Sequence, residues 1–325
     1  MTSVAVQKVD PQTMTKEAIQ DLFRDGMVPR KEEWSFATNE ARKLDLANHV
    51  LRVILQIGLV EEYVDEFDAL LACQKDDGSW GEAANDERHG VRNTCFGARN
   101  LIRAHRELGR PDYLQAAKRS ILHVLGQQDP EGFFKDEVWG PRDATSSSMG
   151  LLHYALKESF GEETAKIHAE ARLALARAAA HLDRSQEADG SWHDTGAYEA
   201  PVGPTSHLLP KMVLFAQGPA APIQNAIDYL VGEQEEDGSW DKQHVDHTCD
   251  AARALLLTYS VVPDPRLPKV VSDAIGWLAN NTADDGLWGV RPGKPSNLIM
   301  TTDVLDAFSK YEAHRRSQDL RIFWQ

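Results

Sequence analysis

The chain has 325 residues, and its 35 Lys and Arg against 50 Asp and Glu give a formal net charge of −15 at pH 7. Such an acidic chain is a poor partner for nucleic acids and for anionic membranes, which attract basic surfaces. With 42% hydrophobic residues it can bury one large core, and no Pro-, Gly- or Ser-rich linker divides it.

Residues 1–35 carry mixed charge and two separated prolines, so we expect an N-terminal extension that wraps the outside or stays partly mobile. The first ten residues lack the apolar core of a signal peptide, and no stretch approaches the roughly 18 apolar residues of a membrane span. The three cysteines are odd in number and widely separated, which argues against a disulfide scaffold. These features predict a cytoplasmic protein without stable membrane insertion; they leave the oligomeric state open.

Apolar residues at helical spacing predict two alternating series of helices from residue 45 onward. One series is rich in Ala, Leu and small residues, which is typical of helices buried on most of their surface; it comprises 45–57, 93–108, 145–156, 205–216, 248–259 and 302–313. The other comprises 61–73, 112–125, 164–183, 222–233 and 269–280. Six inner helices ringed by about as many outer ones predict an all-α fold. We expect a single α6/α6 toroid of repeated helical hairpins over residues 36–316, followed by a tail at 317–325.

A short phrase follows each outer helix of this scheme. Every copy has an acid before a glycine and an aromatic residue two positions after it, and four of five copies have glutamine four positions before it; the glycines are Gly78, Gly132, Gly190, Gly238 and Gly286. A period of about 50 residues indicates an array of similar units. We expect the glycine to adopt a left-handed conformation at the helix end. The aromatic residue should pack against the neighbouring unit and the glutamine should bridge backbone groups, so the phrase is structural.

These phrases resemble the QW repeats of the squalene–hopene and oxidosqualene cyclases, and more loosely the protein prenyltransferase β subunits, which share the α6/α6 toroid. The match covers roughly residues 60–315. The resemblance implies a terpene cyclase-like enzyme, an isomerase or lyase, that performs acid/base chemistry on a small hydrophobic, isoprenoid-like substrate in the central cavity. The reaction would be a protonation-initiated cyclisation, an isomerisation or a lyase step. Two alternatives stay open, because the superfamily is diverse: a non-isoprenoid lyase or hydrolase using Asp, His and Cys, and a non-catalytic binding module.

In such a toroid the inner helices begin at one mouth of the cavity. Four inner helices begin near a threonine, which we expect to act as an N-cap: Thr94, Thr145, Thr205 and Thr248. Aligned on threonine, Arg92, Asp143 and Asp246 are equivalent. So are Cys95, Ser146, Ser206 and Cys249.

The segment 244–249 lies where class II terpene cyclases of this family carry Asp-x-Asp-Asp-Thr-Ala, whose middle aspartate protonates an alkene or epoxide. On that alignment Asp246 takes the position of the acid, and His244 and His247 replace the flanking aspartates. A histidine beside Asp246 should keep its carboxylate ionised, which favours a role as base or as orienter of a histidine. We predict the catalytic residues Asp246, His247, Asp143 and Cys249.

The cysteines suggest a third chemistry. Cys95 and Cys249 occupy matching positions near helix N-termini, where the pKa of a thiol is lowered and a thiolate nucleophile is favoured; burial as small core residues is the alternative. The segment 244–249 also resembles the His-Thr-Cys zinc stretch of prenyltransferase β subunits, but the Asp-x-Cys pair required one repeat earlier has no counterpart. An arrangement of Cys95, His207, His247 and Cys249 around a metal stays open; we predict no metal and no cofactor.

Further residues near the expected mouth are candidates for substrate binding: Cys95, Arg92, His207, Tyr198, Phe96 and Tyr154. Tyr198 and Glu199 lie in the longest inter-helix loop, which could cover the mouth. Asp303 is another cavity candidate, and Arg92, Arg142, Arg291 and Lys294 could hold a diphosphate or carboxylate. An enzyme predicts a deep, mostly apolar cavity with Asp246 or Asp143 pointing into it, whereas a binding module predicts a filled barrel or an exposed apolar groove.

Overall fold

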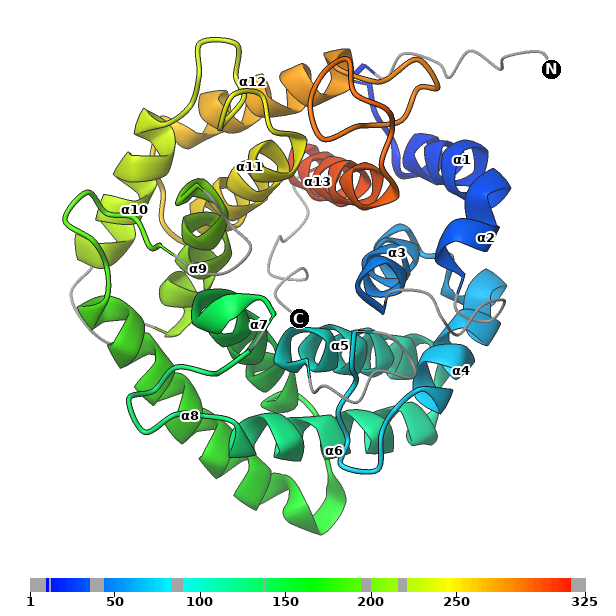
Figure 1. Cartoon of the computed structure of the whole chain (residues 1–325), viewed down its shortest axis with the longest axis vertical. Coiled ribbons are helices and arrows are strands. Elements are labelled where there is room, and N and C mark those ends of the chain that lie inside the picture. The colour runs from blue at the N-terminus through cyan, green and yellow to red at the C-terminus, as the bar shows by residue number, and fades with distance from the viewer. Residues whose placement is uncertain are drawn as a thin grey trace.

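The computed structural model describes residues 10–11, 13–35, 44–82, 90–136, 138–193, 200–215 and 221–316. Over these ranges the chain is helical, and β-structure is limited to isolated bridge pairs. The helices form two concentric rings around a central axis (Figure 1). The predicted all-α toroid is therefore confirmed.

The inner ring consists of α3 (Leu44–Ile57), α5 (Val91–Leu108), α7 (Gly140–Ala155), α9 (Val202–Phe215), α11 (Val245–Tyr259) and α13 (Leu298–Arg315). Each inner helix contacts the next one along the chain, and α13 contacts α3, which closes the ring. These helices bury most of their surface, as their content of Ala, Gly, Ser and Thr predicts. None of the described helices combines the length and hydropathy needed to cross a bilayer.

The outer ring consists of α1 (Lys16–Met27), α4 (Val64–Ala72), α6 (Pro111–Gly126), α8 (Thr164–Arg184), α10 (Ala221–Gly232) and α12 (Leu267–Asn280). Short elements accompany it: η1 (Val28–Arg30), α2 (Lys31–Trp34), η2 (Val60–Tyr63) and η3 (Gly161–Glu163). Helix α1 packs on α13 and α3 and buries Ile19, Leu22 and Phe23. The part of the expected N-terminal extension that the structure describes thus supplies an outer helix of the toroid itself. The expected tail, 317–325, lies outside the described residues.

The glutamine of the repeat phrase joins neighbouring units. Gln128 Nε2 donates to the carbonyl of Gly132 in its own phrase, at 2.9 Å, and to the carbonyl of Ala174 in α8, at 2.8 Å. Gln234 Nε2 does the same with Gly238, at 3.1 Å, and with Val270 in α12, at 2.9 Å. The expected bridging role of the glutamine is confirmed, and the bridge reaches the next outer helix.

The phrase glycines all have positive φ, as predicted. They do not cap the helix, however, because each lies in the turn that follows it: α10 ends at Gly232, and Gly238 has φ 94°. A Cβ on Gly238 would lie 2.8 Å from the carbonyl oxygen of Asp273 in α12. Glycine is required here both by its conformation and by the approach of the next outer helix.

The phrase tryptophan is anchored at both ends. The indole N–H of Trp240 donates to Leu230 O at 2.8 Å, and the Trp240 backbone N–H donates to Thr248 Oγ1 at 3.1 Å. Thr248 Oγ1 in turn donates to His244 O at 2.8 Å. The expected N-cap role of the threonine is therefore wrong, since its hydroxyl lies within the first turn and fastens the phrase to the inner helix. The same backbone-to-threonine bond recurs in the other four units, at Trp80–Thr94, Phe134–Thr145, Trp192–Thr205 and Trp288–Thr301.

Candidate active site

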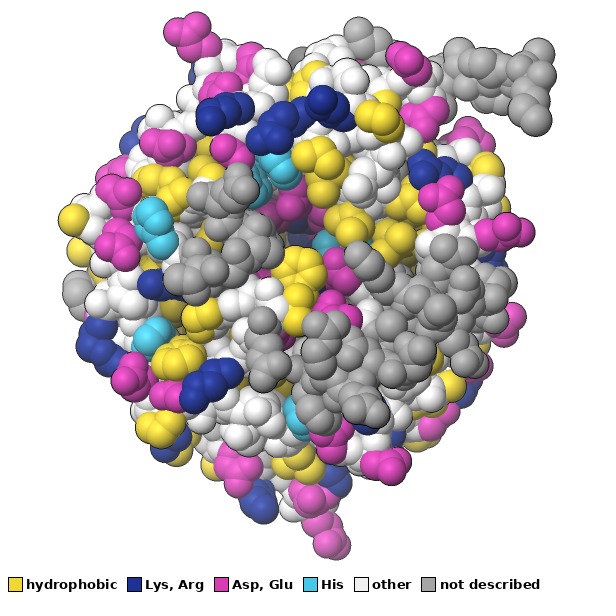
Figure 2. Space-filling model, viewed as in Figure 1, with side chains coloured by type: hydrophobic (Ala, Val, Ile, Leu, Met, Phe, Trp, Pro, Cys, Tyr) yellow, Lys and Arg dark blue, Asp and Glu magenta, His cyan; other side chains and the backbone are white. Residues whose placement is uncertain are grey.

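A main cavity of about 360 Å³ opens where the inner helices begin. Figure 2 shows the opening at the centre of the molecule, with acidic and histidine side chains inside it. Its volume is typical of small-molecule sites. Thirteen of the 17 lining residues carry ionisable side chains, so the cavity holds more charged groups than expected. Its apolar wall consists of Phe96, Trp139, Ile299 and Met300.

Acidic and basic side chains below the mouth pair in a closed circuit through all six inner helices, which we call the ion-pair ring. Its members, in order around the axis, are Asp45 (α3), Arg92 (α5), Asp143 (α7), His207 (α9), Asp250 and Arg253 (α11), Asp303 (α13) and His49 (α3). The circuit returns to its starting helix, because His49 lies 3.6 Å from both Asp303 and Asp45.

The first half of the ring connects α3 to α11. Arg92 pairs with Asp45, and its Nε lies 2.7 Å from Asp143 Oδ2. His207 Nδ1 lies 3.3 Å from Asp143, and its Nε2 lies 2.9 Å from Asp250. Burial alone would lower the pKa of His207, but Asp250 and Asp143 raise it to about 10, so the imidazole is a cation at neutral pH.

The second half connects α11 to α3. Arg253 pairs with Asp250 and lies 2.9 Å from Asp303, and Arg52 lies 2.7 Å from Asp303. Although burial works to raise the pKa of Asp303, His49 and Arg253 hold it well below its ordinary value. Asp303 is therefore ionised, and each carboxylate of the ring lies against a basic side chain.

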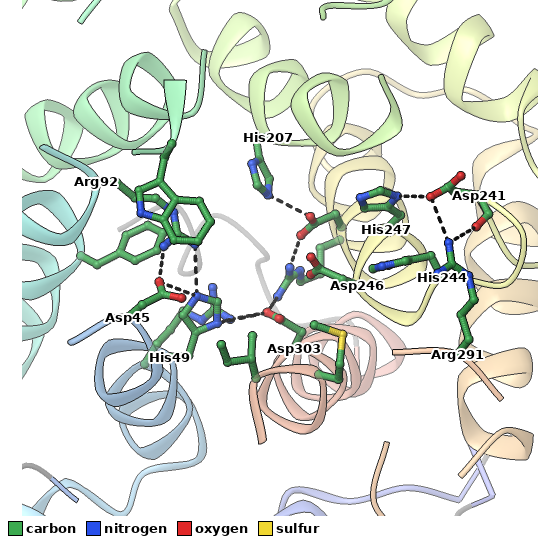
Figure 3. Close-up of a pocket in the computed structure, with 17 residues that line it drawn as sticks. Asp45, His49, Arg92, His207, Asp241, His244, Asp246, His247, Arg291 and Asp303 are labelled. Atoms are coloured by element: carbon green, nitrogen blue, oxygen red, sulfur yellow. Dashed lines mark hydrogen bonds and ion pairs between the residues drawn. The ribbon is translucent and has the colours of Figure 1, made fainter. Parts of the chain in front are cut away.

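Asp246 differs from these carboxylates. It lies in the first turn of α11, one turn before Asp250, and points into the cavity (Figure 3). Among the described residues it has no hydrogen-bond or ion-pair partner. Burial, followed by the charges of Asp250 and Asp303, raises its pKa well above the ordinary value. The cavity thus holds one carboxyl group that favours its protonated form.

The two histidines beside Asp246 interact with Asp241 and with each other. His247 Nδ1 lies 2.9 Å from Asp241 Oδ2 and donates to it, and the His244 ring stacks on the His247 ring at 4.4 Å. Burial lowers the pKa of both, that of His244 to about 4. The expectation that a histidine keeps Asp246 ionised is therefore wrong, because both rings are neutral at pH 7. The Nδ1 of His244 is buried and has no hydrogen-bond partner among the described residues.

A strained segment holds the histidines in place. Asp241, Lys242 and Gln243 are consecutive non-glycine residues with φ of 48°, 55° and 64°. Such conformations persist only where the surroundings enforce them, and they are common at functional sites. Arg291 Nε donates to the carbonyl of Lys242 at 3.1 Å, and its side chain lies 3.8 Å from Asp241.

The cysteines do not reach the main cavity. Cys95 and Cys249 are fully buried, and Cys95 contacts Ser148 at 3.7 Å. Burial raises the pKa of Cys95 to about 12 and that of Cys249 well above its ordinary value. The expected lowering of the thiol pKa values is therefore wrong, because the thiols face neighbouring helices rather than a polar mouth. Both cysteines are core residues, and the chemistry expected of Cys249 has no geometric support.

The other predicted residues divide into three groups. Arg92, His207 and Phe96 line the main cavity. Asp143 is a ring member beneath it, and Tyr154 lies over Arg99 away from it. Tyr198 and Glu199 fall outside the described residues. Across the described ranges no group of three or more His, Cys, Asp or Glu is placed to hold a metal ion, so the arrangement of Cys95, His207, His247 and Cys249 does not form.

Several lining residues were missed in the sequence: Asp45, His49, Arg52, Trp139, Asp250 and Arg253. The sequence spacing of most of these residues could have identified them. Asp45, His49 and Arg52 follow the i, i+4, i+7 spacing of one helix face, and so do Asp246, Asp250 and Arg253. Ionisable residues on one face of a helix that is otherwise small and apolar indicate a polar interior around the axis.

Comparisons with known proteins bear on this site. No protein-family model matches the chain. A drimenyl diphosphate synthase of Streptomyces showdoensis is 29% identical over 175 residues, which are 53% of this chain and 30% of that protein. A squalene–hopene cyclase of Zymomonas mobilis is 25% identical over 206 residues, 55% of this chain and 30% of that protein. The matches thus span under a third of the length of each relative.

Solved structures share the fold. The type II terpene cyclase MstE from Scytonema, in a variant bound to its substrate geranylgeranyl dihydroxybenzoate, superposes with a TM-score of 0.65 and 12% identity over 91% of this chain and 98% of that one. The ent-copalyl diphosphate synthase from Streptomyces platensis gives a TM-score of 0.61 and 17% identity over 83% of this chain and 50% of that one. At these identities the likeness concerns the fold.

Proposed function

We propose that the chain is an enzyme of the terpene cyclase-like superfamily of α/α toroids, in which Asp246 protonates a small isoprenoid-like substrate; the similarity to a drimenyl diphosphate synthase and a squalene–hopene cyclase supports this. The transferred proton starts a cyclisation or an isomerisation. The single observation that carries the proposal is the position of Asp246, whose carboxyl group points into the cavity with no hydrogen-bond or ion-pair partner among the described residues and whose pKa is raised.

The acidic neighbours of Asp246 have two opposing effects. Together with burial, Asp250 and Asp303 raise the pKa of Asp246, which favours its protonated form but makes it a weaker acid. Proton transfer to an alkene leaves a carboxylate and a carbocation side by side, so the charge of the cavity does not change. The carbocation then experiences the same negative charges, whose attraction offsets the weaker acidity.

His244 is the candidate base for the last step. Its Nδ1 has no hydrogen-bond partner in the described part of the chain, and its pKa of about 4 keeps the ring neutral. Removal of a proton from a carbon next to the cation leaves a double bond and a protonated imidazole. Passing that proton back to Asp246 completes an isomerisation in which no atom is gained or lost.

The cavity wall suits a substrate with an apolar body. Phe96, Trp139, Ile299 and Met300 supply apolar surface, and the Arg92 guanidinium covers the Phe96 and Trp139 rings at 4.6 and 4.1 Å. The charged remainder favours a substrate that also carries a polar group. An open cavity with Asp246 inside it supports an enzyme over the alternative of a filled binding module.

Turnover by wild type and by Asp246→Asn tests the proposal. We would offer farnesyl and geranylgeranyl diphosphates, squalene and terpene alcohols, and detect products by mass spectrometry. Asp246→Asn should lower turnover by about 10²-fold or more, the usual contribution of a general acid. The matched control is Asp284→Asn, the same chemical change at an exposed position; it should leave turnover unchanged.

Two results would count against this assignment. Equal turnover by wild type and Asp246→Asn would place the acid elsewhere. No product from any isoprenoid in the panel would favour the non-isoprenoid alternative. His244→Phe should retain protonation but release alcohols formed by water capture of the cation; an unchanged product would rule out His244 as the base.

A further inference from the structure

A second cavity of about 140 Å³ lies further along the toroid axis, on the far side of the ion-pair ring from Asp246. It shares ring residues such as His207 and Asp250 with the main cavity. Basic side chains from five inner helices line it: Arg52, Arg99, Lys211, Arg253 and Lys310. In a chain of net charge −15, this concentration of positive charge in the interior needs an explanation.

The carboxylates around the second cavity are already paired with other cations. Asp143 pairs with Arg92 and His207, and Asp250 pairs with His207 and Arg253. The third, Asp306, pairs with Lys310 and lies 2.9 Å from Arg253. These ion pairs leave Arg99 and Lys211 without a carboxylate partner among the described residues.

Arg99 and Lys211 converge on one space. Both side chains lie against Gly150 of α7, because a Cβ on that glycine would lie 3.2 Å from Arg99 Nη1 and 3.7 Å from Lys211 Cε. The Arg99 guanidinium lies over the rings of Phe96 and Tyr154, at 6.0 and 5.4 Å, and its buried Nε donates to no described residue. Burial, together with Arg99 and Lys310, lowers the pKa of Lys211 to about 7. Two partly buried cations side by side repel each other and lose part of their hydration.

A hydroxyl group completes the arrangement. Ser206 of α9 lines the second cavity, is 3% exposed, and its Oγ has no hydrogen-bond partner among the described residues. Its neighbour on the cavity wall, Ser146, instead donates to His207 O at 2.9 Å. A planar guanidinium, an ammonium and a hydroxyl therefore face one small cavity, each with donors that no described acceptor uses.

We propose that Arg99, Lys211 and Ser206 form a binding site for a phosphate-type oxyanion, either inorganic phosphate or the phosphate end of a small molecule. A phosphate dianion neutralises both cations, whereas a single carboxylate neutralises one. The guanidinium fork and the ammonium are the two side-chain groups that proteins use most for phosphate. The site is separate from the acid chemistry of Asp246, because the ion-pair ring lies between them.

Calorimetric titration of the whole chain with inorganic phosphate tests the site, with pyrophosphate in a parallel titration. Both are run at pH 6.5 and constant ionic strength in chloride. Wild type should show saturable binding to one site. Lys211→Met should lower the affinity by about tenfold or more, because a charge-assisted contact is lost. The matched control is Lys166→Met on the exposed face of α8, which should bind as wild type does.

Further variants separate this site from the mouth of the main cavity. Asp246→Asn should bind phosphate as wild type does. The phosphate site is therefore tested independently of the reaction proposed for Asp246. Loss of phosphate binding in Arg291→Gln, with binding retained in Lys211→Met, would move the anion to the mouth and overturn the proposal. Absence of saturable binding to wild type would overturn it as well.

Stability measurements without phosphate supply a second readout. Lys211→Met removes a partly buried charge that no carboxylate of the described residues compensates, so its melting temperature should equal or exceed that of wild type. A clear fall would mean that Lys211 is already paired and would contradict the proposal. Ser206→Ala changes no charge and little side-chain volume, and it should weaken phosphate binding several-fold. This variant tests the proposed site even if Lys211→Met does not fold.

Discussion

The proton of Asp246 depends on residues that are distant from it in the sequence. The class II motif places aspartates beside the acid, whereas here Asp250 lies one helical turn away and Asp303 comes from α13. Of the histidines that replace the flanking aspartates, His247 bonds Asp241 and His244 stacks on His247. Position 246 could be predicted from the sequence by resemblance, but its protonation state could not, because it depends on the strained backbone of residues 241–243 and on packing between helices.

The raised pKa of Asp246 should affect stability as well as activity. A carboxyl group whose pKa is raised on folding binds more protons in the native state than in the unfolded state. Stability is therefore lost as pH rises from the unfolded pKa, near 4, toward the folded one, by about 1.4 kcal/mol per pH unit. Asp246→Asn lacks this loss. Denaturant unfolding at several pH values should show that the free energy of unfolding of the variant rises relative to that of wild type above pH 4. A constant difference between the two proteins across pH would contradict the raised pKa of Asp246.

At the scale of elements, the helices were predictable because each has its own pattern. The predicted inner helix at 248–259 corresponds to Val245–Tyr259, and the predicted outer helix at 164–183 to Thr164–Arg184. Helix α1 was missed as an outer helix, although Ile19, Leu22 and Phe23 show the spacing of an apolar face and Thr15 caps its start. Only one of the two requirements for the glycine of the repeat phrase was predicted. Its positive φ follows from the phrase, but the approach of the next outer helix is a long-range contact that no local pattern shows.

Two glycines near the end of α10 make a matched pair. Gly238→Ala places a Cβ 2.8 Å from Asp273 O at φ 94°, and should destabilise the fold by at least about 1–3 kcal/mol. Gly232→Ala meets no atom within 4 Å in a helical conformation, and should be neutral or stabilising by up to about 1 kcal/mol. Chemical denaturation measures both. Equal effects would show that the phrase glycine is not required by the contact between units.

Across the whole molecule, ionisable residues follow a common order along three of the inner helices, α3, α11 and α13. Acids come first and bases follow, as in Asp45 to Arg52, Asp246 to Arg253 and Asp303 to Lys310. This order agrees with the helix dipole, which favours acids near N-termini and bases near C-termini. It also explains why the cavity at the mouth holds an acid and the second cavity gathers cations. The sequence contains this order, but its meaning appears only when six helices align around one axis.

The ion-pair ring should be costly to break at Asp303, which serves Arg52, Arg253 and His49 at once. Asp303→Asn removes the carboxylate that these three basic side chains share and should lower the free energy of unfolding by about 3–5 kcal/mol, whereas Asp284→Asn should leave it unchanged. Asp303→Asn should also lower the pKa of Asp246, since Asp303 contributes to raising it. The alkaline limb of the pH–rate profile should therefore lie at lower pH in Asp303→Asn than in wild type. An unshifted limb would contradict the coupling between Asp303 and Asp246.

The contact between α13 and α3 has a consequence for the array as a whole. An open stack of repeats leaves two end faces, which dedicated capping repeats must cover. Here the Arg52–Asp303 pair joins residues 251 positions apart, and α1 continues the outer ring across the same joint. Within the described residues, the first and last repeats therefore cover one another, and neither presents an open end face.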